Sequence, residues 1–298
     1  MSARIAKLRE GDLKTIATCI TLVENELPGY EELLRALPPG RKTRVVGLTG
    51  PPGAGKSTLV NALLQISTQH QMKVAVLSVD PSSPFHQGAL LGDRIRMPAF
   101  YMHPDVYIRS LGSRGNLGGL SAHIIEVLEI IQQAPFDLIL LETVGVGQSE
   151  VEIAGLADIT VVVFVPEAGD DIQTMKAGLM EVADVFVVNK ADRARADELV
   201  RHLQGLVHER GMDASTPVLK CVATEGEGVE ALYDVLLQPD IQKQSEENRI
   251  KHLAEKAWQL IQHRRMKDIS KTGLQQQIKT AIQQDAFNLY RFVSAYNP

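Results

Sequence analysis

The stretch GPPGAGKS, which ends at Ser57, has the residue types that hold a phosphate chain and fits the pattern G-x-x-x-x-G-K-[ST]. Its glycines let successive backbone N–H groups point at phosphate oxygens. The free N–H groups in the first turn of a following helix point at the same oxygens. We expect Lys56 to reach the β- and γ-phosphates and to act in catalysis, and the Ser57 hydroxyl to bind Mg²⁺. The predicted phosphate-binding residues are Gly50, Pro51, Pro52, Gly53, Ala54, Gly55, Lys56, Ser57 and Thr58.

A second motif, VVNKAD, ends at Asp192 and has the chemistry to select the base of a nucleotide. The Asp192 carboxylate can accept two hydrogen bonds from guanine, whereas adenine offers no such pair of donors. We expect Asn189 to brace the loop and the Lys190 stem to lie against the base. The N–H of Ala223, in the stretch CVATEGEG, is placed to meet the guanine carbonyl oxygen. The sequence predicts GTP or GDP as the ligand, and this loop adds Val222, Ala223 and Thr224.

Three acidic residues stand where predicted strands end or the following loops begin, namely Asp80, Asp93 and Glu142. Mg²⁺ prefers oxygen ligands and usually keeps several water molecules. We therefore expect Ser57 and the phosphates to hold the ion, with the three carboxylates binding directly or through water. No redox cofactor is expected.

The stretch ETVGVGQSE, which begins at Glu142, has the pattern of a sensor for the terminal phosphate. The Gly145 N–H is placed to meet the γ-phosphate, and losing that contact on hydrolysis would release the loop. Gln148 and Asp80 are rival candidates for orienting the attacking water. Because no arginine finger is evident either, we predict slow hydrolysis by the isolated protein.

Short β-branched runs alternate with amphipathic helical patterns through the middle of the chain. Most of the runs are apolar on both faces, as strands are when helices cover both sides of a sheet. They are RVVGLT, KVAVLSV, VYIRS, DLILLET, ITVVVFV, VFVVN and PVLKCV. This alternation predicts an α/β fold of the P-loop NTPase type, with a doubly wound, mostly parallel sheet. Ligands of such folds bind beyond the carboxyl ends of the strands.

Helical patterns without strands occupy both ends of the chain. We expect an N-terminal helical extension at residues 1–40, a P-loop GTPase domain at 41–238 and a C-terminal helical region at 239–298. The last region carries an apolar stripe and the aromatic cluster FNLYRF, which is more apolar surface than one monomer is expected to hide. A homodimer formed by this region is therefore expected.

The composition is that of an ordinary globular protein, with 298 residues, 44% hydrophobic residues and a net charge of −5. This charge gives no general attraction to nucleic acid or to an anionic membrane. The two cysteines, Cys19 and Cys221, are far apart in sequence, which argues against a disulfide framework or a zinc ribbon. The N-terminus lacks the apolar core of a signal peptide, and we expect a cytoplasmic protein.

Several longer motifs together resemble one family. VDPSS, GDRIRM, IRSLGSRGNLGGLS, ETVGVGQSE, DDIQTMKAG and VVNKAD occur in an order similar to that of the MeaB/ArgK-type GTPases. This family includes the human methylmalonic aciduria type A protein. The resemblance implies a SIMIBI-like fold and a homodimeric G-protein chaperone for the adenosylcobalamin-dependent methylmalonyl-CoA mutase. Such a chaperone gates the loading of the B12 cofactor and protects the mutase.

The resemblance also assigns roles to particular residues. The acids that match Asp80, Asp93 and Glu142 belong to the metal and switch machinery of the family, and the helical ends serve dimer formation. A further switch that faces the partner is implied for the segment with Asp170, Gln173 and Lys176. The loop after VDPSS departs from the family pattern in the first switch, at Pro84, Phe85, His86 and Arg94.

Two other functions stay open. Related GTPases carry Cys or His clusters and act as metallochaperones, but here we expect His103 and His123 at a loop or helix surface. The family has also been described as a kinase or ATPase for basic amino-acid transport, and the guanine motif argues against ATP. Transfer of the γ-phosphate to a substrate other than water would favour that description.

Overall fold

The computed structural model describes residues 2–40, 43–80, 97–112, 123–143, 153–169, 182–209, 216–239, 246–283, 287–294 and 296 of the 298. The chain divides into two compact units, Met1–Gln244 and Ser245–Pro298. The first unit holds the sheet and every predicted site residue that the structure describes.

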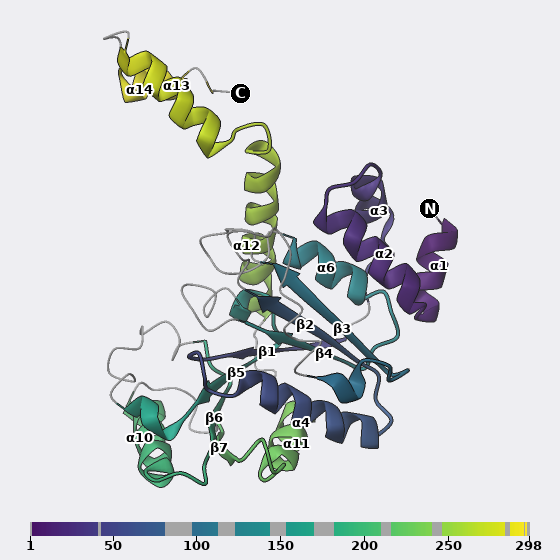
Figure 1. Cartoon of the computed structure of the whole chain (residues 1–298), viewed down its shortest axis with the longest axis vertical. Coiled ribbons are helices and arrows are strands. Elements are labelled where there is room, and N and C mark those ends of the chain that lie inside the picture. The colour runs from purple at the N-terminus through teal and green to yellow at the C-terminus, as the bar shows by residue number, and fades with distance from the viewer. Residues whose placement is uncertain are drawn as a thin grey trace. The chain divides into compact units, whose positions relative to one another are not determined.

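A seven-stranded sheet with the order β3-β2-β4-β1-β5-β6-β7 forms the centre of the first unit, and all of its neighbouring strands are parallel (Figure 1). The predicted α/β fold with a doubly wound sheet is therefore confirmed. The strands are β1 (Arg44–Thr49), β2 (Val74–Asp80), β3 (Val106–Gly112), β4 (Leu138–Glu142), β5 (Ile159–Phe164), β6 (Val185–Asn189) and β7 (Val218–Cys221).

The alternation of side chains along the strands divides the core into two faces, because successive residues of a strand point to opposite sides. Leu48, Val161 and Val187 share one apolar cluster with α4 (Lys56–Gln69) and α11 (Val229–Leu237). These two helices lie side by side against that face (Figure 1). The opposite face packs against α6 (Ile124–Ile131) and, through a separate cluster, against α10 (Ala196–Glu209).

Three N-terminal helices, α1 (Ser2–Glu10), α2 (Leu13–Glu24) and α3 (Tyr30–Ala36), extend the layer that contains α6 (Figure 1). Their buried residues, Leu8, Ile16, Ile20 and Val23 among them, are apolar residues that recur at helical spacing in the sequence. An ion pair between Arg109 on β3 and Glu24 fastens α2 to the edge of the sheet.

The expectation that His123 lies on a surface is wrong. The residue is only 6% exposed at the start of α6, with Glu26 and Glu126 on either side at 3.7 and 3.8 Å. The histidine is buried because the N-terminal helices cover α6, which the local sequence around it does not reveal. His103 lies in a loop, as expected.

Aspartates at the amino edge of the sheet hold neighbouring strands in register. Each precedes a strand and accepts a hydrogen bond from a backbone N–H at the start of the adjacent strand. Asp137 accepts from Lys73 at 2.8 Å, Asp158 from Val45 at 2.8 Å and Asp184 from Thr160 at 2.7 Å. Burial raises the pKa of Asp184 to about 6, although its bond from the Thr160 N–H acts in the opposite direction.

The second unit contains α12 (Glu246–Arg265), α13 (Lys271–Gln283) and α14 (Leu289–Ser294). Within the described part of this unit, α13 and α14 bury no residue, and several large apolar side chains are exposed. They include Ile250, Trp258, Ile261, Met266, Ile282, Leu289, Tyr290 and Val293.

Three short 3₁₀ helices complete the described elements, η1 (Pro98–Phe100), η2 (Ile153–Gly155) and η3 (Pro166–Gly169). No helix among the described residues is long and apolar enough to cross a membrane.

Candidate nucleotide-binding site

The loop between β1 and α4 has a backbone path that requires glycine at two positions. Gly50 has a φ of +138°, and a Cβ atom there would lie 2.2 Å from the backbone oxygen of Val163 on β5. Gly55 has a φ of +86°, and a Cβ atom would lie 2.4 Å from the Asn189 side-chain nitrogen. Both residues therefore allow a close approach of chain segments that a side chain would block.

Lys56 begins α4 and folds back over this loop. Its ammonium group donates to the backbone oxygens of Gly50 and Pro51, at 2.7 and 3.0 Å, and the residue is only 6% exposed. A buried ammonium needs such partners because burial in apolar surroundings disfavours its charge. The charge thus lies at the centre of the loop, beside the N-terminus of a helix, where an anion is electrostatically favoured.

Asn189, at the end of β6, joins two loops through the two ends of its amide. Its Nδ2 donates to the Ala54 carbonyl oxygen at 2.9 Å, and its Oδ1 accepts from the Ala223 N–H at 3.1 Å. These two hydrogen bonds are the contacts through which Asn189 can brace the loop, as the sequence predicts. The Ala223 N–H, which the sequence predicts to meet guanine, donates to Asn189 in this structure.

The turn after β6 presents the carboxylate of Asp192 to solvent. The Arg193 N–H donates to the Lys190 oxygen at 3.1 Å, and Lys190 has a left-handed φ of +55°. The Lys190 ammonium donates to the Gly53 oxygen at 2.8 Å, which ties this turn to the phosphate loop. Asp192 is exposed, so its acceptor oxygens are accessible to a ligand.

Ser57 and Glu142 bring a hydroxyl and a carboxylate together beside the phosphate loop. The Ser57 hydroxyl donates to Glu142 Oε1 at 2.6 Å, and both residues are partly or fully buried. Two hard oxygen donors next to a phosphate loop fit the coordination chemistry of Mg²⁺. Asp80 ends β2. Ser78, two residues earlier, is in register with Glu142, so the backbone of Asp80 lies at the same edge of the sheet.

The remaining predicted site residues lie outside the described residues. They are Asp93, Gly145, Gln148, Asp170, Gln173 and Lys176. The divergent positions Pro84, Phe85, His86 and Arg94 also lie outside the described residues. Those that are described gather at the carboxyl edge of the sheet, after β1, β2, β4, β6 and β7. Sequence reasoning overlooked Glu167, which follows β5 at this edge, and Arg193. Their positions after predicted strands are the signal that could have revealed them.

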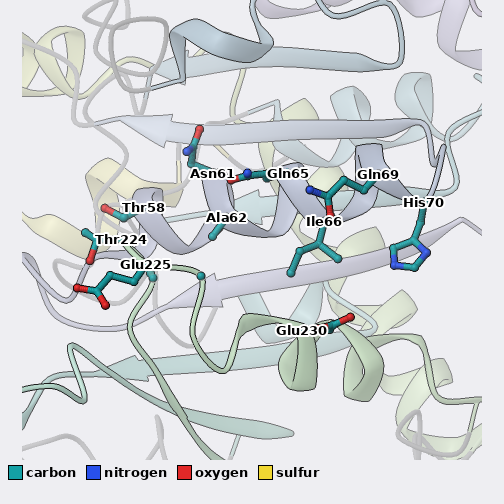
Figure 2. Close-up of a pocket in the computed structure, with 12 residues that line it drawn as sticks. Thr58, Asn61, Ala62, Gln65, Ile66, Gln69, His70, Thr224, Glu225 and Glu230 are labelled. Atoms are coloured by element: carbon teal, nitrogen blue, oxygen red, sulfur yellow. The ribbon is translucent and has the colours of Figure 1, made fainter.

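A groove of about 610 Å³ runs along α4 beside the β7–α11 loop (Figure 2). Thr58, Thr224 and Glu225 lie at one end and His70 at the other, with Glu230 contributed by α11. Its lining residues include two glutamates and neither lysine nor arginine, so it does not attract phosphate groups. The phosphate loop, rather than this groove, therefore has the electrostatics for a nucleotide's phosphates.

Comparison with known protein families shows which family the chain belongs to. The family described as "Methylmalonyl Co-A mutase-associated GTPase MeaB" matches residues 16–281, which is most of the chain. The chain belongs to the MeaB family. The resemblance noted in the sequence is thus confirmed, as is the expected enzyme class, a P-loop GTPase.

Individual MeaB relatives agree with this assignment. A putative GTPase of Pyrococcus horikoshii is 41% identical, over 93% of this chain and 84% of its own length. The GTPase ArgK of Escherichia coli is 38% identical, over 80% of this chain and 75% of its own. A crystal structure described as a LAO/AO transport system kinase has a TM-score of 0.69 and 25% identity, and the match covers 99% of this chain and 95% of that one.

Proposed function

We propose that this protein binds GTP, hydrolyses it slowly and acts as a chaperone that gates adenosylcobalamin loading of methylmalonyl-CoA mutase and protects that enzyme. The observation that carries the proposal is membership of a family described as mutase-associated GTPases. The phosphate loop and the turn with Asp192 support the nucleotide part. The mutase is proposed to bind this protein in its GTP-bound or its GDP-bound state.

In this proposal the guanine base is read by Asp192, with the Lys190 stem against its plane. The phosphates occupy the loop that ends at Ser57, where Lys56 exchanges its carbonyl partners for phosphate oxygens. Mg²⁺ would be held by Ser57 and the phosphates, with Glu142 accepting from the serine or binding the ion. When bound, the ion neutralises charge on the β- and γ-phosphates. Asp80 and Asp93 are proposed to complete this set.

The water-orienting residue is proposed to be either Asp80 or Gln148, and Gly145 is proposed to sense the γ-phosphate. Single-turnover hydrolysis by Asp80→Asn and Gln148→Ala, with GTP affinity measured in parallel, separates the two candidates. The variant that slows hydrolysis while keeping GTP affinity identifies the residue. If both variants hydrolyse GTP at the parental rate, neither residue orients the water.

Further proposals concern the rest of the chain. Residues 1–40, 41–238 and 239–298 are proposed to act as the N-terminal extension, the GTPase domain and the region of a homodimer contact. Asp170, Gln173 and Lys176 are proposed to face the partner, and the cytoplasm is the proposed location. The exposed apolar side chains of the second unit support the homodimer, since such surface is usually covered.

The decisive experiment is recovery of a B12-dependent mutase on immobilised protein in the presence of GTP, GDP or no nucleotide. We expect recovery to depend on the nucleotide. The matched control is Asp192→Asn, which should respond to xanthine nucleotides in place of guanine ones. Equal recovery of unrelated proteins, with no mutase among them, would end the chaperone proposal and leave the GTPase intact.

A second candidate function follows from the crystal structure described as a LAO/AO transport system kinase, which matches nearly the whole chain. A kinase would transfer the γ-phosphate to an acceptor other than water. Incubation with γ-labelled GTP and candidate basic amino acids or their binding proteins tests this reading. Label that appears only in inorganic phosphate would exclude it.

The metallochaperone alternative has less support from the described residues. Cys19 and Cys221 are both buried, and burial raises the pKa of each thiol, that of Cys221 to about 12. Metal binding requires the thiolate, which these environments disfavour. Among the described residues, no group of three or more His, Cys, Asp or Glu side chains has a metal-binding arrangement.

A further inference from the structure

An ion pair connects two loops at the carboxyl edge of the sheet. Arg193 Nη1 donates to Glu167 Oε1 at 2.5 Å, although the two residues are 26 positions apart. Glu167 belongs to η3, directly after β5, and Arg193 belongs to the turn after β6. Because β5 and β6 are adjacent parallel strands, the pair bridges the loops that leave them side by side. The contact lowers the pKa of Glu167, chiefly through this hydrogen bond.

The turn that carries Asp192 is thus held from two directions. On one side, Lys190 donates to Gly53 in the phosphate loop. On the other side, Arg193 donates to Glu167. The exposed carboxylate of Asp192 lies between these two anchors in the sequence. A carboxylate that accepts two hydrogen bonds from a planar base must keep both its position and its orientation.

Charge gives the pair a second effect. Arg193 is the immediate neighbour of Asp192, and an unpaired guanidinium is a strong donor for a nearby carboxylate. If Arg193 turned to Asp192, it would occupy the oxygens that guanine requires. Glu167 provides a competing carboxylate and holds the guanidinium at η3. The Arg193 and Glu167 side chains are 48% and 55% exposed, so the pair contributes little to the free energy of unfolding. Its effect is to hold the turn and the guanidinium in position.

We propose that Arg193 and Glu167 form a positioning pair for guanine recognition, which fixes the turn of Asp192 and keeps the Arg193 guanidinium away from its carboxylate. The inference rests on the proposed guanine-binding function. Neither residue is proposed to touch the nucleotide.

The test compares GDP with IDP, which lacks the 2-amino group and so offers Asp192 one donor instead of two. Dissociation constants for both nucleotides are measured by calorimetry for the parent, Glu167→Gln, Arg193→Gln and the charge-exchanged double variant Glu167→Arg/Arg193→Glu. We expect each single variant to bind GDP about two- to fivefold more weakly, with a smaller change for IDP. The double variant should recover at least half of the lost GDP preference, because it restores the pair.

Asp197→Asn is the matched control, since it breaks an ion pair of 2.9 Å with Lys220 that is also exposed to solvent and lies outside the site. It should leave the GDP preference unchanged. An equal loss for GDP and IDP in the single variants, no loss in either, or no recovery in the double variant would overturn the positioning role. Failure of the parent protein to prefer guanine nucleotides would instead overturn the proposed function, and the inference with it.

Discussion

The hydroxyl of Ser57 donates to the carboxylate of Glu142, with 2.6 Å between Oγ and Oε1, although 85 positions separate the two residues. One follows β1 and the other ends β4, and these strands are neighbours in the sheet. The two oxygens therefore lie at hydrogen-bond distance because of the strand pairing. In the proposed Mg²⁺ site, this pre-organisation would lower the cost of assembling the ligands.

Replacing Glu142 by Gln tests this arrangement. The amide oxygen can still accept from Ser57, but the negative charge is lost. We expect GTP affinity in the presence of Mg²⁺ to fall by about tenfold. Affinity for GDP in excess chelator should change little, and this measurement is the internal control. An equal loss with and without Mg²⁺ would show that Glu142 acts only through the fold.

Replacing Asp192 by Asn should redirect the preferred base. An asparagine side chain offers a donor to xanthine and loses the charged acceptor for guanine. GDP affinity is expected to fall by about 10- to 100-fold, while XDP affinity rises. Competition of the two diphosphates for a fluorescent nucleotide measures both changes. If the variant keeps its preference for GDP, Asp192 does not read the base.

Two glycine substitutions form a matched pair. Gly50→Ala places a Cβ atom against the Val163 oxygen at a φ of +138°, so it should lower the unfolding free energy by about 2–3 kcal/mol. Gly205→Ala adds a Cβ atom within α10, where no atom lies within 4 Å, and should raise it by about 0.5–1 kcal/mol. Denaturant titration measures both, and opposite signs are the expected outcome.

Asp184 should make stability fall as pH rises from about 4 to 6. Its pKa is about 6 in the folded protein and near 3.8 when unfolded, so the folded state binds more protons in this window. The loss is at most about 3 kcal/mol. Asp184→Asn cannot ionise and should lose less stability than the parent across the same window. A stability difference between the two proteins that stays constant from pH 4 to pH 7 would contradict this account.

Trp258 and Ile261 are 57% and 49% exposed and lie three positions apart on α12, hence on one side of that helix. If this surface forms the proposed homodimer, Trp258→Glu/Ile261→Glu should sediment as a monomer that keeps the helix content of the parent. Gln259→Glu adds charge to the same helix and serves as the control. A parent protein that already sediments as a monomer would contradict the dimer proposal.

The strands and their order of occurrence follow from the sequence, because a buried parallel strand must be apolar on both faces. The run RVVGLT is β1, and VFVVN is β6, with unchanged ends. The glycine pattern likewise predicts a loop in which the backbone wraps closely, and the structure has positive φ values at Gly50 and Gly55 in this loop. Such features depend on local chemistry, so a single sequence can reveal them.

Contacts between distant segments could not be predicted in the same way. His123 is buried because α2 covers α6, and nothing adjacent to it in sequence indicates that cover. Asn189 bonds to Ala54 and Ala223 because β6 lies close to the loops after β1 and β7 in the folded sheet. The pair of Arg193 with Glu167 depends on the adjacency of β5 and β6. The contacts of Asn189 and Arg193 require the strand order, and the burial of His123 requires the packing of α2 on α6; the sequence pattern leaves both open.

The pairing of β1 has a consequence for how the chain is made. Arg44 is in register with Leu138, and Val46 with Ile159, so both neighbours of β1 are synthesised long after it. A nascent chain that has emerged from the ribosome only as far as β3 contains the whole phosphate loop but neither strand that supports it. The contact of the phosphate loop with β5, where Gly50 meets the backbone oxygen of Val163, can therefore form only after β5 has been translated.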